Sequence, residues 1–137
     1  MIPRIVFDTN VLVSGLLVKS TPPAQAFDLV LSSGEFIVSP ELVVELSSVL
    51  RRTVFDAYVS LASREAFLTR FVERATLLFP LSIVSDCRDL KDNHLLALAL
   101  DGKAQYLVTG DNDLLVLNPF RGIDILNPAD FLKRVSL

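Results

Sequence analysis

Acidic residues occur at four places in this sequence where a carboxylate could help to hold a divalent cation. They are Asp8, Glu45, Asp92 and Asp111. Two of them follow short apolar runs, and the other two fall in segments whose apolar residues recur at helical spacing. Carboxylate oxygens are the ligands that hard cations such as Mg²⁺ and Mn²⁺ prefer. The chemistry that this pattern predicts is the binding of a divalent metal ion.

Predicted strands place Asp8 and Asp111. The run 2–7 is rich in β-branched residues and ends at Asp8, and the run 106–109 is followed by Gly110 and Asp111. In an open parallel sheet, ligands bind outside the carboxyl ends of the strands, so both carboxylates could point into one crevice. The alternative is that each residue only caps the helix that follows it, which is a common role for Asp.

Predicted helices place Glu45 and Asp92. Glu45 lies on the margin of the apolar stripe of a helix over 40–50, and Asp92 projects near the middle of the inward face of a helix over 90–100. An unpaired buried carboxylate is costly, so such a residue is normally paired, protonated or bound to a metal. The alternatives are a solvated position for Glu45 and a first-turn position for Asp92, with Asp89 as the helix cap.

Four carboxylates in one pocket would repel one another unless a cation neutralised them. The segments that carry them offer no cluster of basic partners, so we expect Mg²⁺ or Mn²⁺ to do so. The formal net charge of the chain is −3, which excludes nucleic-acid binding by diffuse positive charge. Without these four carboxylates the net charge of the remaining residues would be slightly positive. The composition therefore remains compatible with a phosphate substrate.

The elements that must position these acids alternate between strand and helix. The predicted strands cover 2–7, 36–38, 78–84, 106–109 and 123–126. The predicted helices cover 11–17, 22–33, 40–50, 60–77, 90–100 and 128–135. Short strands separated by helices are typical of parallel crossovers. We therefore predict an α/β fold, a three-layer α/β/α sandwich with a mostly parallel central sheet, in a single domain over residues 1–137.

Several side chains have predicted positions within this fold. Pro80 predicts that the 78–84 strand lies at the edge of the sheet, because proline has no N–H to donate to a neighbouring strand. On the 60–77 helix, the polar side opposite the phenylalanines carries Arg64, Arg70 and Arg74. His94, which is the only histidine, is expected at the surface, and Cys87 is expected in a semi-buried loop.

Composition adds expectations about location and partners. Apolar residues make up 51% of the chain and the mean hydropathy is +0.49, so we expect exposed apolar surface for a partner and consider a homodimer. The single cysteine excludes an internal disulfide framework and fits a reducing compartment. No apolar run approaches the roughly 20 residues that cross a bilayer, and no secretory signal opens the sequence, so we expect no membrane association and a cytoplasmic location.

Four short stretches combine these acids with characteristic neighbours. They are 5–12 (IVFDTNVL), 39–46 (SPELVVEL), 88–93 (RDLKDN) and 109–115 (TGDNDLL). In this order and at these separations the chain resembles the PIN-domain nucleases, especially the toxin components of toxin–antitoxin pairs akin to VapC. One departure is Leu90, which stands where this group usually has proline before the Lys-Asp pair. That change loosens a loop and removes no ligand.

The resemblance implies roles for particular residues. It makes the four acids a metal-binding and catalytic quartet, with Asn10 and Thr109 orienting the carboxylates and Asp113 as an extra acid. It also implies metal-dependent endoribonuclease activity, with RNA as substrate and an antitoxin as controlling partner.

Basic residues near these stretches could guide an RNA strand, because phosphate contacts position a strand without reading its sequence. They are Arg51, Arg52, Arg88 and Lys91. The alternative for Arg51 and Arg52 is that they satisfy carbonyl groups at the end of a helix.

Two other functions are weighed against the nuclease. Haloacid-dehalogenase-like phosphatases also begin with a strand that ends in Asp, but they need a second acid two positions later, where this chain has Asn10. The other alternative is a non-catalytic adaptor or regulatory domain that binds a partner through its apolar surface and an acidic pocket.

Overall fold

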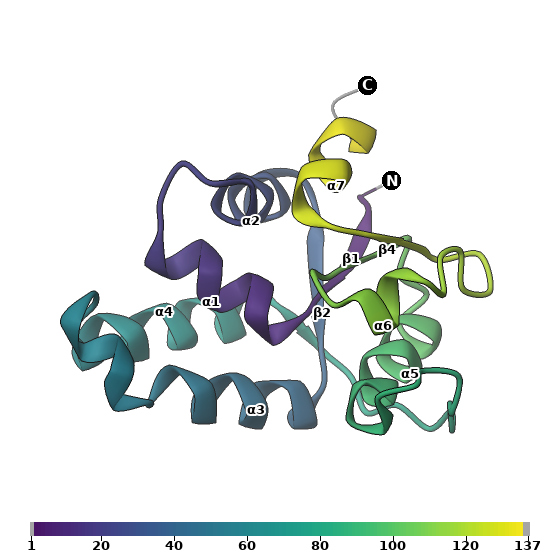
Figure 1. The fold of residues 1–137 in the computed structure, drawn as a ribbon, viewed down its shortest axis with the longest axis horizontal. Coiled ribbons are helices and arrows are strands. Elements are labelled where there is room, and N and C mark those ends of the chain that lie inside the picture. The colour runs from purple at the N-terminus through teal and green to yellow at the C-terminus, as the bar shows by residue number, and fades with distance from the viewer. Residues whose placement is uncertain (1, 136–137) are drawn as a thin grey trace.

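The computed structural model describes residues 2–135, whose strands form one five-stranded sheet in the order β3-β2-β1-β4-β5 (Figure 1). Every neighbouring pair of strands is parallel. The strands are β1 Arg4–Phe7, β2 Glu35–Val38, β3 Thr76–Leu77, β4 Tyr106–Val108 and β5 Asp124–Leu126. The predicted parallel sheet is thus confirmed.

Helices cover both faces of this sheet. They are α1 Thr9–Leu17, α2 Pro22–Ser33, α3 Pro40–Leu50, α4 Leu61–Arg74, α5 Asn93–Asp101, α6 Asn112–Leu115 and α7 Pro128–Val135, with 3₁₀ turns η1 Thr53–Ala57 and η2 Leu90–Asp92. Figure 1 shows α1, α2 and α4 on one side of the sheet and α5 on the other. α5 packs against β1, β2 and β4, and α7 packs against α2. The three-layer α/β/α architecture is therefore confirmed.

The register of the two central strands brings two polar residues together. Ile5, Val6 and Phe7 of β1 are at most 1% exposed, so the apolar run forms a buried strand as expected. Phe7 is registered against Val108 of β4, and the Asp8 N–H donates to the Val108 carbonyl at 2.9 Å. Asp8 and Thr109, which follow these strands, consequently lie side by side at the carboxyl edge of the sheet.

The predicted helix over 60–77 and strand over 78–84 are wrong in their bounds. α4 ends at Arg74, and the edge strand is β3, so only the edge position was predicted correctly. Beyond β3 the chain is tied to the end of α5, because Asp101 Oδ2 accepts from the N–H groups of Leu81 and Ser82 at 2.6 and 2.9 Å. The chain there stays outside any strand.

A row of apolar side chains projects from this edge. Its members are Leu77, Phe79, Leu81 and Ile83, which are 52, 70, 90 and 96% exposed. They alternate with half-buried or buried residues, as side chains do along extended chain. We call them the edge ridge. The expected exposed apolar surface is confirmed here, and among the described residues no helix is long and apolar enough to cross a membrane.

Arg64 is buried, so its predicted position on the polar side of the helix is wrong. Its side chain is 0% exposed and ion-pairs with Asp56 in η1. The guanidinium also donates to the carbonyl groups of Leu50 at 2.6 Å, Arg52 at 3.1 Å and Val59 at 3.0 Å. The physical reason is that the C-terminus of α3 and the turn after it leave carbonyl groups without partners, which a buried guanidinium satisfies.

We predict that Arg64→Leu lowers the free energy of unfolding by about 2–4 kcal/mol, because it leaves buried carbonyl groups unsatisfied. Chemical denaturation of the purified protein measures this. The matched control is Arg70→Leu, an exposed arginine of the same helix, which should change stability by less than about 0.5 kcal/mol. Equal effects of the two substitutions would show that the Arg64 bonds do not stabilise this connection.

Candidate metal centre

Asp8 belongs to a group of interacting carboxylates, with Glu45, Asp92 and Asp111, that we call the acidic pocket. Its side chain is 5% exposed, and its Oδ2 accepts from the Thr109 hydroxyl at 2.8 Å. It is also the N-cap of α1, accepting weakly from the Asn10 N–H at 3.4 Å, so the capping alternative and the pocket position both apply. Burial raises the pKa of Asp8, and the charges of Glu45 and Asp111 add to that rise, while the bonds from Thr109 and Asn10 lower it.

Asp111 is tied to Asp8 through Thr109. The Asp111 N–H donates to the Thr109 hydroxyl oxygen at 3.0 Å, and that hydroxyl donates to Asp8. Asp111 Oδ1 accepts from the Asp113 N–H at 2.9 Å and so caps α6. Thr109 is 0% exposed, so water does not compete for its hydroxyl. This chain of bonds holds the ends of two neighbouring strands in one arrangement.

Asp92 carries the most perturbed carboxyl group of the pocket. It ends η2, where carboxylate oxygens of Asp89, Asp92 and Asp111 all lie within 4.8 Å of one another. Burial raises the pKa of Asp92 to about 7, helped by the adjacent Asp111 carboxylate and by the charges of Asp8 and Asp89. Its Oδ2 is buried and has no hydrogen-bond partner within residues 2–135. A carboxylate in such surroundings calls for a cation or a proton.

Glu45 borders the same pocket from α3. Its side chain is 41% exposed, and its Oε2 lies 3.1 Å from His94 Nε2 on α5. Its negative charge is one cause of the raised pKa of Asp8, so the two carboxylates are neighbours. The structure therefore brings Asp8, Asp92 and Asp111 into mutual electrostatic contact and sets Glu45 beside Asp8.

Sequence reasoning missed the proximity of Asp89 and misplaced His94. Asp89 was considered only as a helix cap, which it is, since its Oδ1 accepts from the Lys91 N–H at 3.3 Å. His94 was expected at the surface, yet its side chain is 11% exposed. The segment predicted as one helix begins with a 3₁₀ turn, in which successive side chains are rotated by about 120° instead of the 100° of an α-helix. The side chains after this turn therefore point in other directions than the helical pattern predicts. The i, i+3 spacing of Asp89 and Asp92 was the available signal.

The remaining predicted residues lie around the pocket. Asn10 is exposed and reaches Asp8 through its backbone N–H, while Asp113 is half-buried beside Asp111. Cys87 is 2% exposed, and burial raises the pKa of its thiol, as suits a structural cysteine. The four basic residues expected along an RNA path are all exposed: Arg51, Arg52, Arg88 and Lys91.

The donor set fits a hard divalent cation. All the clustered ligand atoms are carboxylate oxygens, and the buried Oδ2 of Asp92 offers an acceptor without a donor in the described part of the chain. Mg²⁺ and Mn²⁺ bind through such oxygens and through water.

Known proteins share this sequence pattern and fold. The sequence model of a family described as PIN domain matches residues 4–113. An uncharacterized protein of Methanocaldococcus jannaschii, MJ1680, is 30% identical over 118 residues, which cover 83% of this chain and 74% of that protein.

Solved structures with the same fold are more distant in sequence. PAE2754 from Pyrobaculum aerophilum superposes with a TM-score of 0.64 at 13% identity, over 98% of this chain and 96% of that one. VapBC2 from Rickettsia felis, bound to a DNA fragment from its promoter, gives a TM-score of 0.58 at 14% identity, over 90% of this chain and 98% of that one. At these identities the likeness concerns the fold.

We predict that the metal-free protein becomes less stable as the pH rises. The pKa of Asp92 is about 7 in the folded protein against a usual 3.8, so the folded state binds this proton more tightly than the unfolded state does. Its stabilising effect is complete below the unfolded pKa and is lost as the pH rises from about 4 to about 7. The raised pKa of Asp8 acts in the same direction.

Thermal unfolding in EDTA should therefore give a higher Tm near pH 5.5 than near pH 8. Asp92→Asn should reduce this difference, chiefly by raising the Tm at the higher pH, whereas Asp28→Asn, at an exposed position on α2, should leave it unchanged. An unaltered pH dependence in Asp92→Asn would contradict the prediction.

Proposed function

The chain belongs to the PIN-domain family of nucleases, and on this premise we propose that it is a metal-dependent endoribonuclease that hydrolyses phosphodiester bonds of RNA with Mg²⁺ or Mn²⁺. The observation that carries the proposal is the buried Oδ2 of Asp92, which has no hydrogen-bond partner within residues 2–135 and lies among the oxygens of Asp89 and Asp111. Cytoplasmic location and a single PIN-like domain over residues 1–137 belong to the same proposal.

In this proposal Asp8, Asp92 and Asp111 hold the cation, and Glu45 holds a second ion or the attacking water. A divalent ion bound there supplies a Lewis acid, which favours hydroxide over water and stabilises charge on the leaving oxygen. Thr109 fixes the Asp8 carboxylate through its hydroxyl. Attack by water at phosphorus predicts products with a 5′-phosphate and a 3′-hydroxyl.

The exposed Arg88 directly precedes Asp89, and the exposed Lys91 lies in η2 with its Nζ 3.8 Å from Asp89 Oδ2, so both cations are close to the acidic pocket. We propose that they bind the phosphates that flank the scissile bond, and that Arg51 and Arg52, just beyond α3, extend this path. Contacts of this kind would position the RNA without recognising its base sequence.

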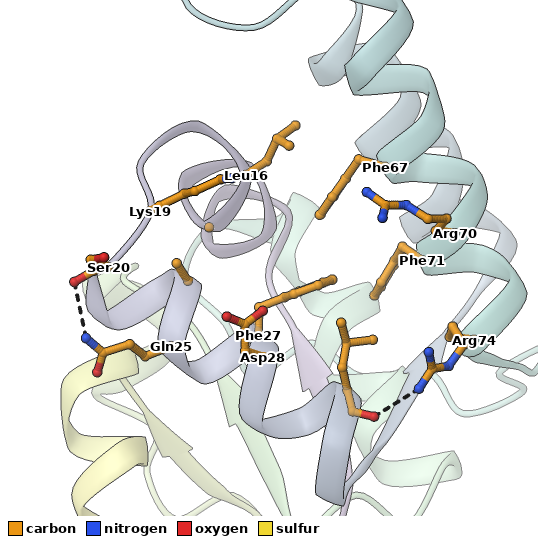
Figure 2. A pocket seen from close by; sticks show the side chains of 13 residues that line it. Leu16, Lys19, Ser20, Gln25, Phe27, Asp28, Phe67, Arg70, Phe71 and Arg74 are labelled. Carbon is orange, nitrogen blue, oxygen red and sulfur yellow. Dashed lines mark hydrogen bonds between the residues drawn. The ribbon is translucent and has the colours of Figure 1, made fainter.

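An antitoxin is the proposed protein partner, as for the toxin of a toxin–antitoxin pair, and a groove between α1, α2 and α4 is its proposed binding site. The groove has a volume of about 660 Å³. Figure 2 shows Phe27, Phe67 and Phe71 projecting into it, with Arg70 and Arg74 along α4. The rim carries Lys19, Arg70 and Arg74 against one acid, Asp28, so the groove suits an amphipathic segment that carries acidic residues. The structural similarity to VapBC2 from Rickettsia felis supports this choice of partner.

We also propose that two copies of the chain associate through the edge ridge. Four large apolar side chains in a row are unfavourable in water, and a second copy presents the same row, so pairing about a twofold axis would bury both.

We predict metal-dependent cleavage of RNA by the purified protein. End-labelled single-stranded RNA should be cut with Mg²⁺ or Mn²⁺, left intact in EDTA, and cut at least about 100-fold more slowly by Asp8→Asn, because that change removes the central ligand. Asp28→Asn, at an exposed position on α2, is the matched control and should cut as the wild type does.

Other outcomes of this assay select the rival functions. Release of phosphate from monoesters, without cleavage of RNA, would favour a phosphatase. A protein that neither cuts RNA nor binds Mn²⁺ would favour the adaptor, and either result would reject the nuclease.

We predict that the double substitution of Leu81 and Ile83 by lysine abolishes self-association, because it places charges in the middle of the edge ridge. Sedimentation velocity over a range of concentrations measures the dimer fraction. Val44→Lys, at a position on α3 that is 68% exposed, is the control and should leave the dimer intact. A wild-type chain that remains monomeric at every concentration would reject the dimer.

A further inference from the structure

The only histidine of the chain makes its side-chain hydrogen bond to a carboxylate of the acidic pocket. His94 belongs to the first turn of α5, two residues after Asp92, and its Nε2 lies 3.1 Å from Glu45 Oε2 on α3. The imidazole is 11% exposed and the glutamate 41% exposed. The bond thus joins a well-packed ring to a carboxylate that could otherwise turn toward solvent.

The surroundings of the ring determine which nitrogen carries the proton. An ionised carboxylate only accepts hydrogen bonds, so Nε2 must be the donor in this pair. The other nitrogen, Nδ1, is buried and has no partner in the described chain. The hydrogen bond between Nε2 and Glu45 is therefore the one side-chain hydrogen bond of the ring within residues 2–135.

This bond restricts Glu45. A glutamate has three side-chain torsions, and a half-exposed one samples several rotamers unless a contact selects among them. Holding Oε2 against α5 limits the positions that Oε1 can take relative to Asp8, whose pKa already reflects the charge of Glu45.

We infer that His94 is a positioning residue that holds Glu45 ready to bind a divalent cation or its water. This inference rests on the proposed function, because it assigns His94 a part in the same site. Residues that hydrogen-bond to metal ligands typically change metal affinity about 10- to 100-fold when they are removed.

The test measures Mn²⁺ binding to the metal-free protein by calorimetry, beside RNA cleavage and thermal unfolding. We expect His94→Leu to weaken Mn²⁺ binding about 10-fold or more. His94→Gln keeps an N–H donor near the place of Nε2 and should recover most of that loss. The cavity of about 440 Å³ that His94 lines, with Ser39, Pro40 and Ala97 among its walls, gives a flexible amide room to adjust.

A double-mutant cycle separates positioning from a general loss of structure. If His94 acts through Glu45, then His94→Leu should weaken Mn²⁺ binding in the wild type and add little in a Glu45→Gln background. Full additivity in this cycle, equal binding by His94→Leu and the wild type, or a failure of His94→Gln to recover binding would each overturn the inference.

Failure of the proposed function has a different signature. RNA cleavage that is absent in the wild type, or that is unaffected by Asp8→Asn, rejects the nuclease, while the binding cycle still reports whether His94 acts through Glu45. If RNA cleavage requires Asp8 but substitutions of His94 leave Mn²⁺ binding unchanged, the nuclease function is supported and the positioning role of His94 is rejected.

Discussion

The Thr109 hydroxyl holds the ends of the two central strands together against the repulsion of their carboxylates. It donates to Asp8 and accepts from the Asp111 N–H, while it is itself fully buried. Without a cation, the folded chain must keep buried acidic groups close together, and the pKa of Asp92 is raised by its burial and by the neighbouring carboxylates. The sheet register, the short helix after Asp111 and the turn before α5 all serve to maintain this costly arrangement, which a bound ion would relieve.

Much of the fold was predictable because it is encoded locally. The apolar runs of β1, β2 and β4 are short and bounded by clear helix signals, such as Ser39, whose side chain accepts from the Leu42 N–H as a cap. Asp8 and Asp111 were identifiable as pocket residues since parallel strands bring their carboxyl ends to one edge. Glu45 and Asp92 were identified by a different argument, from their positions at the margin and on the inward face of predicted helices.

Other features depend on contacts that no local pattern reveals. Arg64 is buried because carbonyl groups 12 and 14 residues earlier in the chain need donors, and the helical pattern of α4 cannot show this. His94 is covered because a 3₁₀ turn changes the direction of side chains after Leu90 and brings the ring to α3. Asp89 joins the cluster through that same turn.

The Asp101 carboxylate, which accepts from two N–H groups beyond β3, also limits how copies of this chain can associate. Sheets that expose free backbone donors along an outer strand can grow by adding strands from other molecules, which leads to swapped or fibrous aggregates. Here the N–H groups of Leu81 and Ser82 are occupied and Pro80 has none to offer. An added strand would find no free donor over residues 80–82, so a contact there would form through the side chains of the edge ridge, and pairing about a twofold axis closes after two molecules.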